Sequence, residues 1–222
     1  MKNLASIFGK SLAVLALFAL TYTFAKAQGS FEGSVSYAIR VTGKDAQAFL
    51  ENEPPKKMDL HVKEGNFIIS LSGGRIGRTM LFIADSNETY IIDAANRRAF
   101  KETYYLDTVK TVPTAVPTGK IVEIKGIPCK EYVVDKPKLQ EKIYYYVNDQ
   151  YRVDMALYAG KTEAKTDFLT NGLEGRIPLR KVMKTAYLTT ELDLMSVKKT
   201  THAPENFQIP AGFKIKKRDP RK

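Results

Sequence analysis

The sequence predicts a mainly β fold: an antiparallel sheet with two short helices. Apolar and polar residues alternate with a period of two along many short segments, as in half-buried strands. Turn residues recur about every 8–12 positions, which is the spacing of antiparallel all-β architectures. Several central segments are apolar on both faces, so something must cover each face of those strands.

The first predicted strand covers residues 31–41. It places on one face the apolar side chains of Phe31, Val35, Tyr37, Ile39 and Val41. Residues 45–52 predict a short helix with Asp45 as N-cap, and Pro54-Pro55 prevents its continuation. A meander of five strands follows, with turns rich in Gly, Asn and Asp, at 57–63, 67–72, 79–84, 88–93 and 98–104.

The second half of the chain continues this pattern. Residues 106–118 contain two prolines and predict a surface connection. Further strands are expected at 121–124, 129–134 and 142–147, and residues 161–171 predict a second helix closed by Gly172. A final hairpin pairs 177–185 with 189–199, and a turn at 207–213 brings apolar residues back onto the body. No composition shift separates two cores, so we expect a single domain.

The first 27 residues have the layout of a secretory signal peptide. Lys2 and Lys10 precede the apolar run Leu12–Leu20, and Ala25-Lys26-Ala27 offers small residues at a cleavage site. The run is shorter than the roughly 20 residues of a membrane-spanning helix. We therefore expect cleavage between Ala27 and Gln28, a mature domain of residues 28–222, and a periplasmic or secreted protein that is not integral to the membrane.

Charge is concentrated at the C-terminal end. The 222-residue chain has a net charge of +11, and residues 197–222 hold eight basic residues and two acidic ones. Such an end favours contact with an anionic envelope surface, although a solvated terminus that only aids solubility is the alternative. The residues expected to make this contact are Lys214, Lys216, Lys217, Arg218, Arg221 and Lys222. The tyrosines lie in predicted strands and do not interleave with these residues, which argues against nucleic acid.

Four short motifs, in this order, resemble a secreted bacterial envelope family with a domain of unknown function. They are FEGSVSY at 31–37, KGIPCKEYVV at 125–134, GRIPLR at 175–180 and FQIPAGFK at 207–214. That family is similar to the LolA-like fold of periplasmic lipoprotein carriers. The resemblance implies a curved, open antiparallel half-barrel with two or three short helices on its concave side, where carriers of this type hold acyl chains. It brings no catalytic residues.

The apolar strands and this resemblance together predict a ligand-binding concave face. Taking one face of each central strand, the expected lining residues are Phe67, Ile69, Met80, Phe82, Tyr90, Tyr144 and Tyr146. A one-residue error in register would move such a residue to the other face.

Other chemistry finds little support in the sequence. Zinc takes about four ligands, whereas the chain contains two histidines, His61 and His202, and one cysteine, Cys129. We expect Cys129 to be a small core residue, because no nucleophile signature surrounds it. The G-x-S-x-G and P-loop patterns are also missing from the sequence. We expect no cofactor, no metal and no enzymatic activity.

These observations leave three classes of function open. The first is a non-enzymatic protein that binds a lipid or other apolar ligand in the concavity of its sheet. The second is a structural or interaction protein whose core is filled by its own helices and whose basic C-terminus contacts anionic surfaces. The third is an enzyme of a type without a known signature.

Overall fold

The computed structural model describes residues 30–75, 77–102, 113–161 and 165–217. The described strands all belong to one compact unit, Phe31–Lys222. The predicted signal peptide, residues 1–27, lies outside the described residues. In the described ranges, no helix is both long and apolar enough to cross a membrane.

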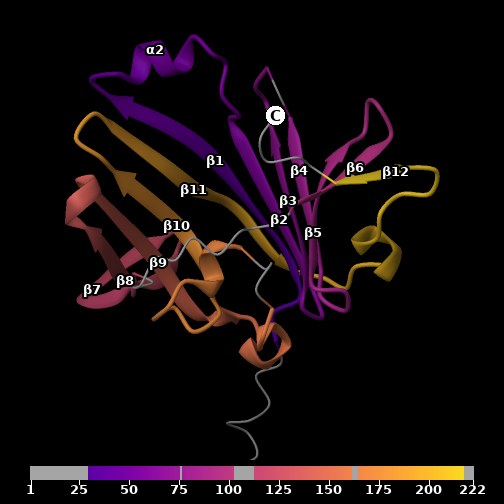
Figure 1. Ribbon diagram of the computed structural model, residues 1–222. Helices are drawn as coiled ribbons and strands as arrows, with labels where there is room; N and C mark the ends of the chain where they lie inside the picture. The colour runs from indigo at the N-terminus through magenta and orange to yellow at the C-terminus, as the bar shows by residue number, and fades with distance from the viewer. Residues whose placement is uncertain (1–29, 76, 103–112, 162–164, 218–222) are drawn as a thin grey trace, which may run out of the picture. The chain divides into compact units, whose positions relative to one another are not determined.

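Twelve strands form one open sheet in the order β12-β6-β5-β4-β3-β2-β1-β11-β10-β9-β8-β7 (Figure 1). All of its pairings are antiparallel except that of β12 with β6. The strands are β1 (Gly33–Gly43), β2 (Lys57–Lys63), β3 (Asn66–Ser72), β4 (Arg78–Ile83), β5 (Glu88–Asp93), β6 (Arg98–Glu102), β7 (Val116–Ile124), β8 (Ile127–Lys136), β9 (Glu141–Arg152), β10 (Arg176–Lys184), β11 (Leu188–Lys199) and β12 (Lys214–Lys217).

Helical structure is sparse in the described residues. The α-helix α2 (Ala46–Leu50) buries none of its residues and connects β1 to β2 beyond the ends of these strands (Figure 1). The described residues also contain four 3-10 turns: η1 (Pro137–Leu139), η2 (Met155–Tyr158), η3 (Asp167–Leu169) and η4 (Pro204–Phe207). The prediction of an α-helix at 161–171 is wrong for the described residues 165–171, which contain only η3; residues 162–164 lie outside the description.

Tight turns with positive φ angles join the hairpins. Glu64 and Gly65 have φ angles of 47° and 83° between β2 and β3, and Lys125 and Gly126 have 49° and 80° between β7 and β8. Two consecutive left-handed residues make a turn whose twist matches that of the flanking strands, and glycine adopts this conformation without steric cost. These turns fix the register of the two hairpins.

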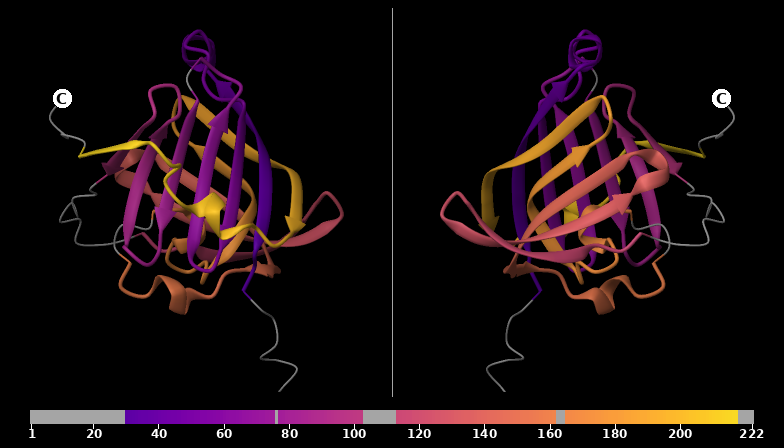
Figure 2. Two further views of the ribbon diagram at one scale, coloured as in Figure 1. Left: turned by 90° about the vertical axis from the view of Figure 1, so that its right-hand side faces the viewer. Right: turned by 90° about the vertical axis from the view of Figure 1, so that its left-hand side faces the viewer.

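The sheet is curved, so its two halves face each other across a concave face (Figures 1 and 2). Register shifts occur between β1 and β11 at Ser36/Tyr37, and between β10 and β9 on both sides of Pro178. Such bulges bend a strand and increase its twist. Strand pairing places Val35, Leu60, Ile69 and Met80 on the concave face. Their neighbours along each strand therefore lie on the opposite, convex face.

Both faces of the central strands are covered. On the concave face, Phe168 of η3 packs against Phe67, and Tyr158 of η2 packs against Phe82. On the convex face, η4 contacts β3 and β4 (Figure 2) and buries Phe207, which is 3% exposed. The 3-10 turns of the chain thus cover apolar side chains on both faces of these strands, where the sequence had predicted α-helices.

Two strand predictions need correction. Residues 116–118, predicted as the end of a surface connection at 106–118, form the start of β7. Residues 106–112 of that connection lie outside the described residues. Lys214–Lys217, predicted as part of a basic tail, form β12 along the edge of β6. The other predicted strands are present with shifted ends, and β2 and β5 have the predicted bounds.

Candidate ligand-binding cavity

A cavity of about 340 Å³ lies on the concave face. Strands from both halves of the sheet line it, because β3 and β10 are separated by three strands in the sheet and meet only across the concavity. Its lining residues are Tyr37, Met58, Leu60, Ile69, Lys165, Thr166, Asp167, Phe168, Pro178, Lys181 and Leu192. A second hollow of about 440 Å³, near the β8–β9 and β10–β11 turns, is lined mainly by polar and charged residues.

The apolar wall follows from strand alternation. Tyr37, Leu60 and Ile69 point to the same face of three adjacent strands, where Leu192 of β11 joins them. The Tyr37 hydroxyl donates a 2.7 Å hydrogen bond to the carbonyl of Pro178. This bond satisfies a buried polar group at the bulge of β10, as burial requires, and burial raises the pKa of Tyr37.

An ion pair supplies the polar part of the cavity. Lys181 Nζ lies 2.7 Å from Asp167 Oδ1, and the Tyr145 hydroxyl lies 3.4 Å from the same oxygen. Burial disfavours the charged form of Lys181, but Asp167 and Tyr145 outweigh this effect, so the pKa of Lys181 lies above its ordinary value. A cationic ammonium group therefore stands beside an apolar wall.

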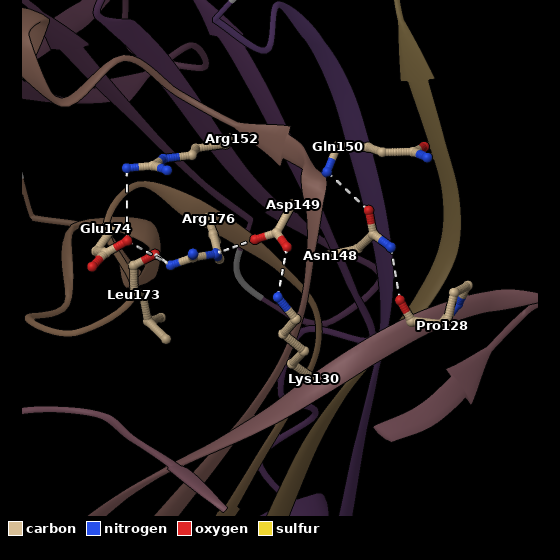
Figure 3. A network of polar contacts seen from close by, with 9 residues as sticks. All are labelled: Pro128, Lys130, Asn148, Asp149, Gln150, Arg152, Leu173, Glu174 and Arg176. Atoms are coloured by element: carbon tan, nitrogen blue, oxygen red, sulfur yellow. Dashed lines mark hydrogen bonds and ion pairs between the residues drawn. The ribbon is translucent and has the colours of Figure 1, made fainter. Parts of the chain in front are cut away.

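A polar network positions the segment that carries Phe168 (Figure 3). Arg176 bonds to Asp149 at 2.6 Å, to Glu174 at 3.0 Å and to the Leu173 carbonyl at 3.1 Å. Asp149 also accepts a 2.7 Å hydrogen bond from Lys130 of β8. These contacts join the end of the segment 165–175 to β8 and β9.

We expect Asp149→Asn to lower the free energy of unfolding by about 0.5–1 kcal/mol at pH 7, because about half of this side chain faces solvent. Hydrogen bonds from Lys130 and Arg176 lower the pKa of Asp149 below its ordinary value of 3.8. A carboxylate with a depressed pKa stabilises the fold above its ordinary pKa, and this contribution is lost as pH falls through the lower, folded-state value. Urea unfolding from pH 7 to pH 2 measures the difference between wild type and variant.

That difference should be constant at neutral pH and should shrink below pH 3.8. Asp135→Asn is the matched control, because Asp135 is as exposed as Asp149 and pairs with the half-exposed Lys142, whereas Asp149 also binds Arg176, whose side chain is only 13% exposed. At pH 7 the control should lose less than about 0.5 kcal/mol. A difference for Asp149→Asn that persists unchanged to pH 2 would contradict the role of this carboxylate.

Four of the seven predicted lining residues lie on the concave face. Ile69 lines the cavity. Phe67 and Phe82 are fully buried beneath η2 and η3, and Met80 packs against the same core. Their shared face follows from the register of β3 and β4, in which Phe67 pairs with Phe82 and Ile69 with Met80.

The other three predicted residues lie on the convex face. Tyr90 pairs with Leu81, which is the neighbour of Phe82 on β4, so Tyr90 lies on the face opposite to Phe82. Tyr144 and Tyr146 pair with Val182 and Arg180, and it is Tyr145 between them that faces the concave side. Both faces of these strands carry apolar or aromatic residues, so the period of two could not select the face.

Several cavity residues were missed in the sequence. Tyr37 could have been found, because it lies on the predicted apolar face of the first strand. The alternation of apolar and polar residues in 189–199 could likewise have indicated Leu192 as a lining residue. No pattern indicated Lys181, Asp167 or Phe168, because the turn that carries the last two reaches β10 only in the folded chain.

Cys129 is fully buried and donates from Sγ to the Ile127 carbonyl at 3.4 Å. Burial raises the pKa of its thiol to about 11, so the thiolate that a nucleophile requires is not formed at neutral pH. The two histidines, His61 and His202, contact the Ser34 hydroxyl on the convex face.

The predicted anionic-surface residues are only partly described. Lys214, Lys216 and Lys217 are exposed on β12. Arg218, Arg221 and Lys222 lie outside the described residues.

Comparisons with known proteins bear on the fold alone. No protein-family model and no curated protein matches the chain significantly. A crystal structure of an uncharacterized conserved protein from Thermus thermophilus is similar, with a TM-score of 0.52 and 10% identity over 91% of this chain and 99% of that one. PNGF-II in space group P21 gives a TM-score of 0.41 and 15% identity over 85% of this chain; the match spans about a third of PNGF-II, 32%.

Proposed function

We propose that this protein is a non-enzymatic carrier that binds a lipid or other apolar ligand in the concave cavity of its sheet. The observation that carries the proposal is the apolar wall of Tyr37, Leu60, Ile69 and Leu192, closed by Phe168. Ligand sites are typically concave and mainly apolar, with few polar groups that fix orientation. Each methylene buried there contributes about 0.8 kcal/mol.

The charged residues suggest the kind of ligand. Two lysines, Lys165 and Lys181, and one carboxylate, Asp167, line the cavity. Since Asp167 pairs with Lys181, the second lysine, Lys165, gives the lining a net positive charge, which favours an anionic head group on that side of the cavity, such as the carboxylate of a fatty acid. The volume of about 340 Å³ is near the lower end of ligand sites, about 300–1,000 Å³, which favours one acyl chain over a lipid with several.

The sequence supports the same proposal. The ordered motifs resemble the envelope family that is similar to LolA-like carriers, and the curved, open antiparallel sheet is compatible with that fold. Cleavage between Ala27 and Gln28 would release the mature domain into the periplasm or the medium, where a carrier of acyl chains has a use.

A fluorescent fatty acid titrated into the protein that begins at Gln28 tests this function. We expect saturable binding of one probe per chain, with displacement by an unlabelled fatty acid. The matching fatty alcohol, which lacks the anionic head, should displace the probe less well. A signal that rises linearly without saturation would contradict the proposal.

One observation favours the alternative, an interaction protein that contacts anionic surfaces. All four residues of β12 are exposed, and β12 pairs with Arg98–Lys101 of β6, so basic side chains gather along one edge of the sheet. Each lysine near an anionic membrane contributes about 1 kcal/mol of attraction.

If that alternative holds, changing Lys214, Lys216 and Lys217 together to glutamine should weaken binding to anionic vesicles at least tenfold at low salt. Co-sedimentation with phosphatidylglycerol vesicles measures this effect, and phosphatidylcholine vesicles give the baseline. The control changes three other exposed lysines, Lys44, Lys56 and Lys138, and alters the net charge equally. Equal losses in both triple variants would show a general charge effect instead of a surface on β12.

A further inference from the structure

The two histidines of the chain meet on the convex face, although they are far apart in the sequence. His61 is on β2, and His202 is in the segment that follows β11. The Ser34 hydroxyl lies 2.9 Å from His61 Nδ1 and 3.1 Å from His202 Nε2. The two rings are nearly perpendicular, with centres 5.1 Å apart.

The surrounding groups hold both imidazoles in place. Lys63 Nζ donates to the His202 carbonyl at 2.6 Å, and the His202 amide donates to Glu32 Oε1 at 3.3 Å. The His202 ring also packs edge-on against Phe207. On the β2 side, Asp59 accepts from Ser36 and pairs with Lys57. The nearby charges are therefore two carboxylates and two lysines, and both histidines remain partly accessible to solvent.

We propose that His61 Nδ1 and His202 Nε2 form a two-histidine site for a divalent transition-metal ion. The spacing of the rings suits one tetrahedral ion. An imidazole nitrogen binds zinc at about 2.0–2.1 Å, which places two ring centres about 5 Å apart at the tetrahedral angle. The observed separation is 5.1 Å.

The atoms around the hydroxyl agree with this geometry. Neighbouring ligand atoms of a tetrahedral zinc ion are about 3.3 Å apart. The two distances from Ser34 Oγ, 2.9 and 3.1 Å, are close to that spacing. The ion would thus lie between the two ring nitrogens, with the hydroxyl near a third vertex.

The chemistry of the site suits a borderline metal ion. Neutral imidazole is a preferred ligand of zinc, copper and nickel. Within the described residues, no group of three or more His, Cys, Asp or Glu side chains is placed to hold a metal. Water therefore completes the coordination, and we expect an exchangeable site that binds Cu²⁺ more tightly than Zn²⁺.

Metal binding here has a structural consequence. His61 belongs to the sheet, whereas His202 belongs to the segment that leads through η4 to β12. An ion bound by both rings would fasten this C-terminal segment to the convex face. Since it binds only the folded arrangement, it should also raise the unfolding temperature.

The test uses the untagged protein that begins at Gln28, with 15N-labelled histidine. Each imidazole gives its own pair of ring-nitrogen signals, Nδ1 and Nε2, and the two pairs can be told apart because the chain has only two histidines. On addition of ZnCl₂, we expect both rings to respond together and to saturate near one equivalent. No response up to millimolar zinc, or a response of one ring alone, would overturn the proposal.

Variants separate metal binding from a merely structural hydrogen bond. His61→Gln and His202→Gln should each weaken zinc binding at least tenfold by calorimetry and remove the metal-dependent rise in unfolding temperature. Ser34→Ala keeps both ligands and should change the zinc affinity less than threefold. Unchanged affinity in both histidine variants would place the metal elsewhere. The wild-type nuclear magnetic resonance titration decides the question even if one variant fails to fold.

Discussion

Ile69→Glu is expected to abolish binding of a fatty acyl probe, with a loss of affinity of at least a hundredfold. The side chain of Ile69 lines the apolar wall of the concave cavity. A carboxylate at this position must either be desolvated by the acyl chain or exclude it, and an unpaired buried charge costs several kcal/mol. Fluorescence titration at pH 7 measures the effect.

Ile68→Glu is the matched control. Ile68 precedes Ile69 on β3, is also half-buried, and pairs with Leu81 and His61 on the convex face. The same substitution there should change probe affinity less than threefold, provided that circular dichroism shows a folded chain. Equal losses at the two positions would mean that the probe does not bind to the concave face.

Phe168→Ala should reduce the free energy of unfolding by about 3–5 kcal/mol, which is the usual cost of truncating a buried phenylalanine. Phe168 is 1% exposed, and its ring contacts Phe67 and Tyr158 at centre distances of 5.7 and 5.6 Å. The segment 165–175 has little regular structure, so its position on the sheet depends on this side chain. Urea denaturation measures the loss.

Phe49→Ala provides the comparison, because Phe49 is 42% exposed on α2. That change should cost less than about 0.5 kcal/mol. If Phe168→Ala costs no more than Phe49→Ala, the turn η3 does not form part of the core.

The strands were predictable where one face is buried and a marked turn follows. β2 and β5 have the predicted bounds because alternation and turn residues indicate the same ends. β12 was missed because the sequence KIKK has no apolar face, and its strand conformation comes from pairing with β6. Where the helix expected at 161–171 is described, at 165–171, the chain forms a 3-10 turn whose Phe168 packs against Phe67.

The site was less predictable than the fold, because it depends on contacts between distant parts of the chain. Ile69 was correctly expected on the concave face. Tyr144 and Tyr146 were expected there too but lie on the convex face, because their strand is apolar on both faces and alternation could not select the side. The ion pair of Lys181 with Asp167 and the meeting of His61 with His202 join residues that only the curvature and the C-terminal segment bring together. A single sequence carries no local signal of either contact.

The most direct test of the central claim is to identify what the protein holds when it is purified. The protein should be isolated from the envelope fraction under mild conditions and extracted with organic solvent, and mass spectrometry should be run beside an unrelated control protein. We predict close to one equivalent of a lipid or fatty acid, absent from the control. An empty extract, together with no uptake of a fluorescent acyl probe, would contradict the account and indicate a cavity that serves no apolar ligand.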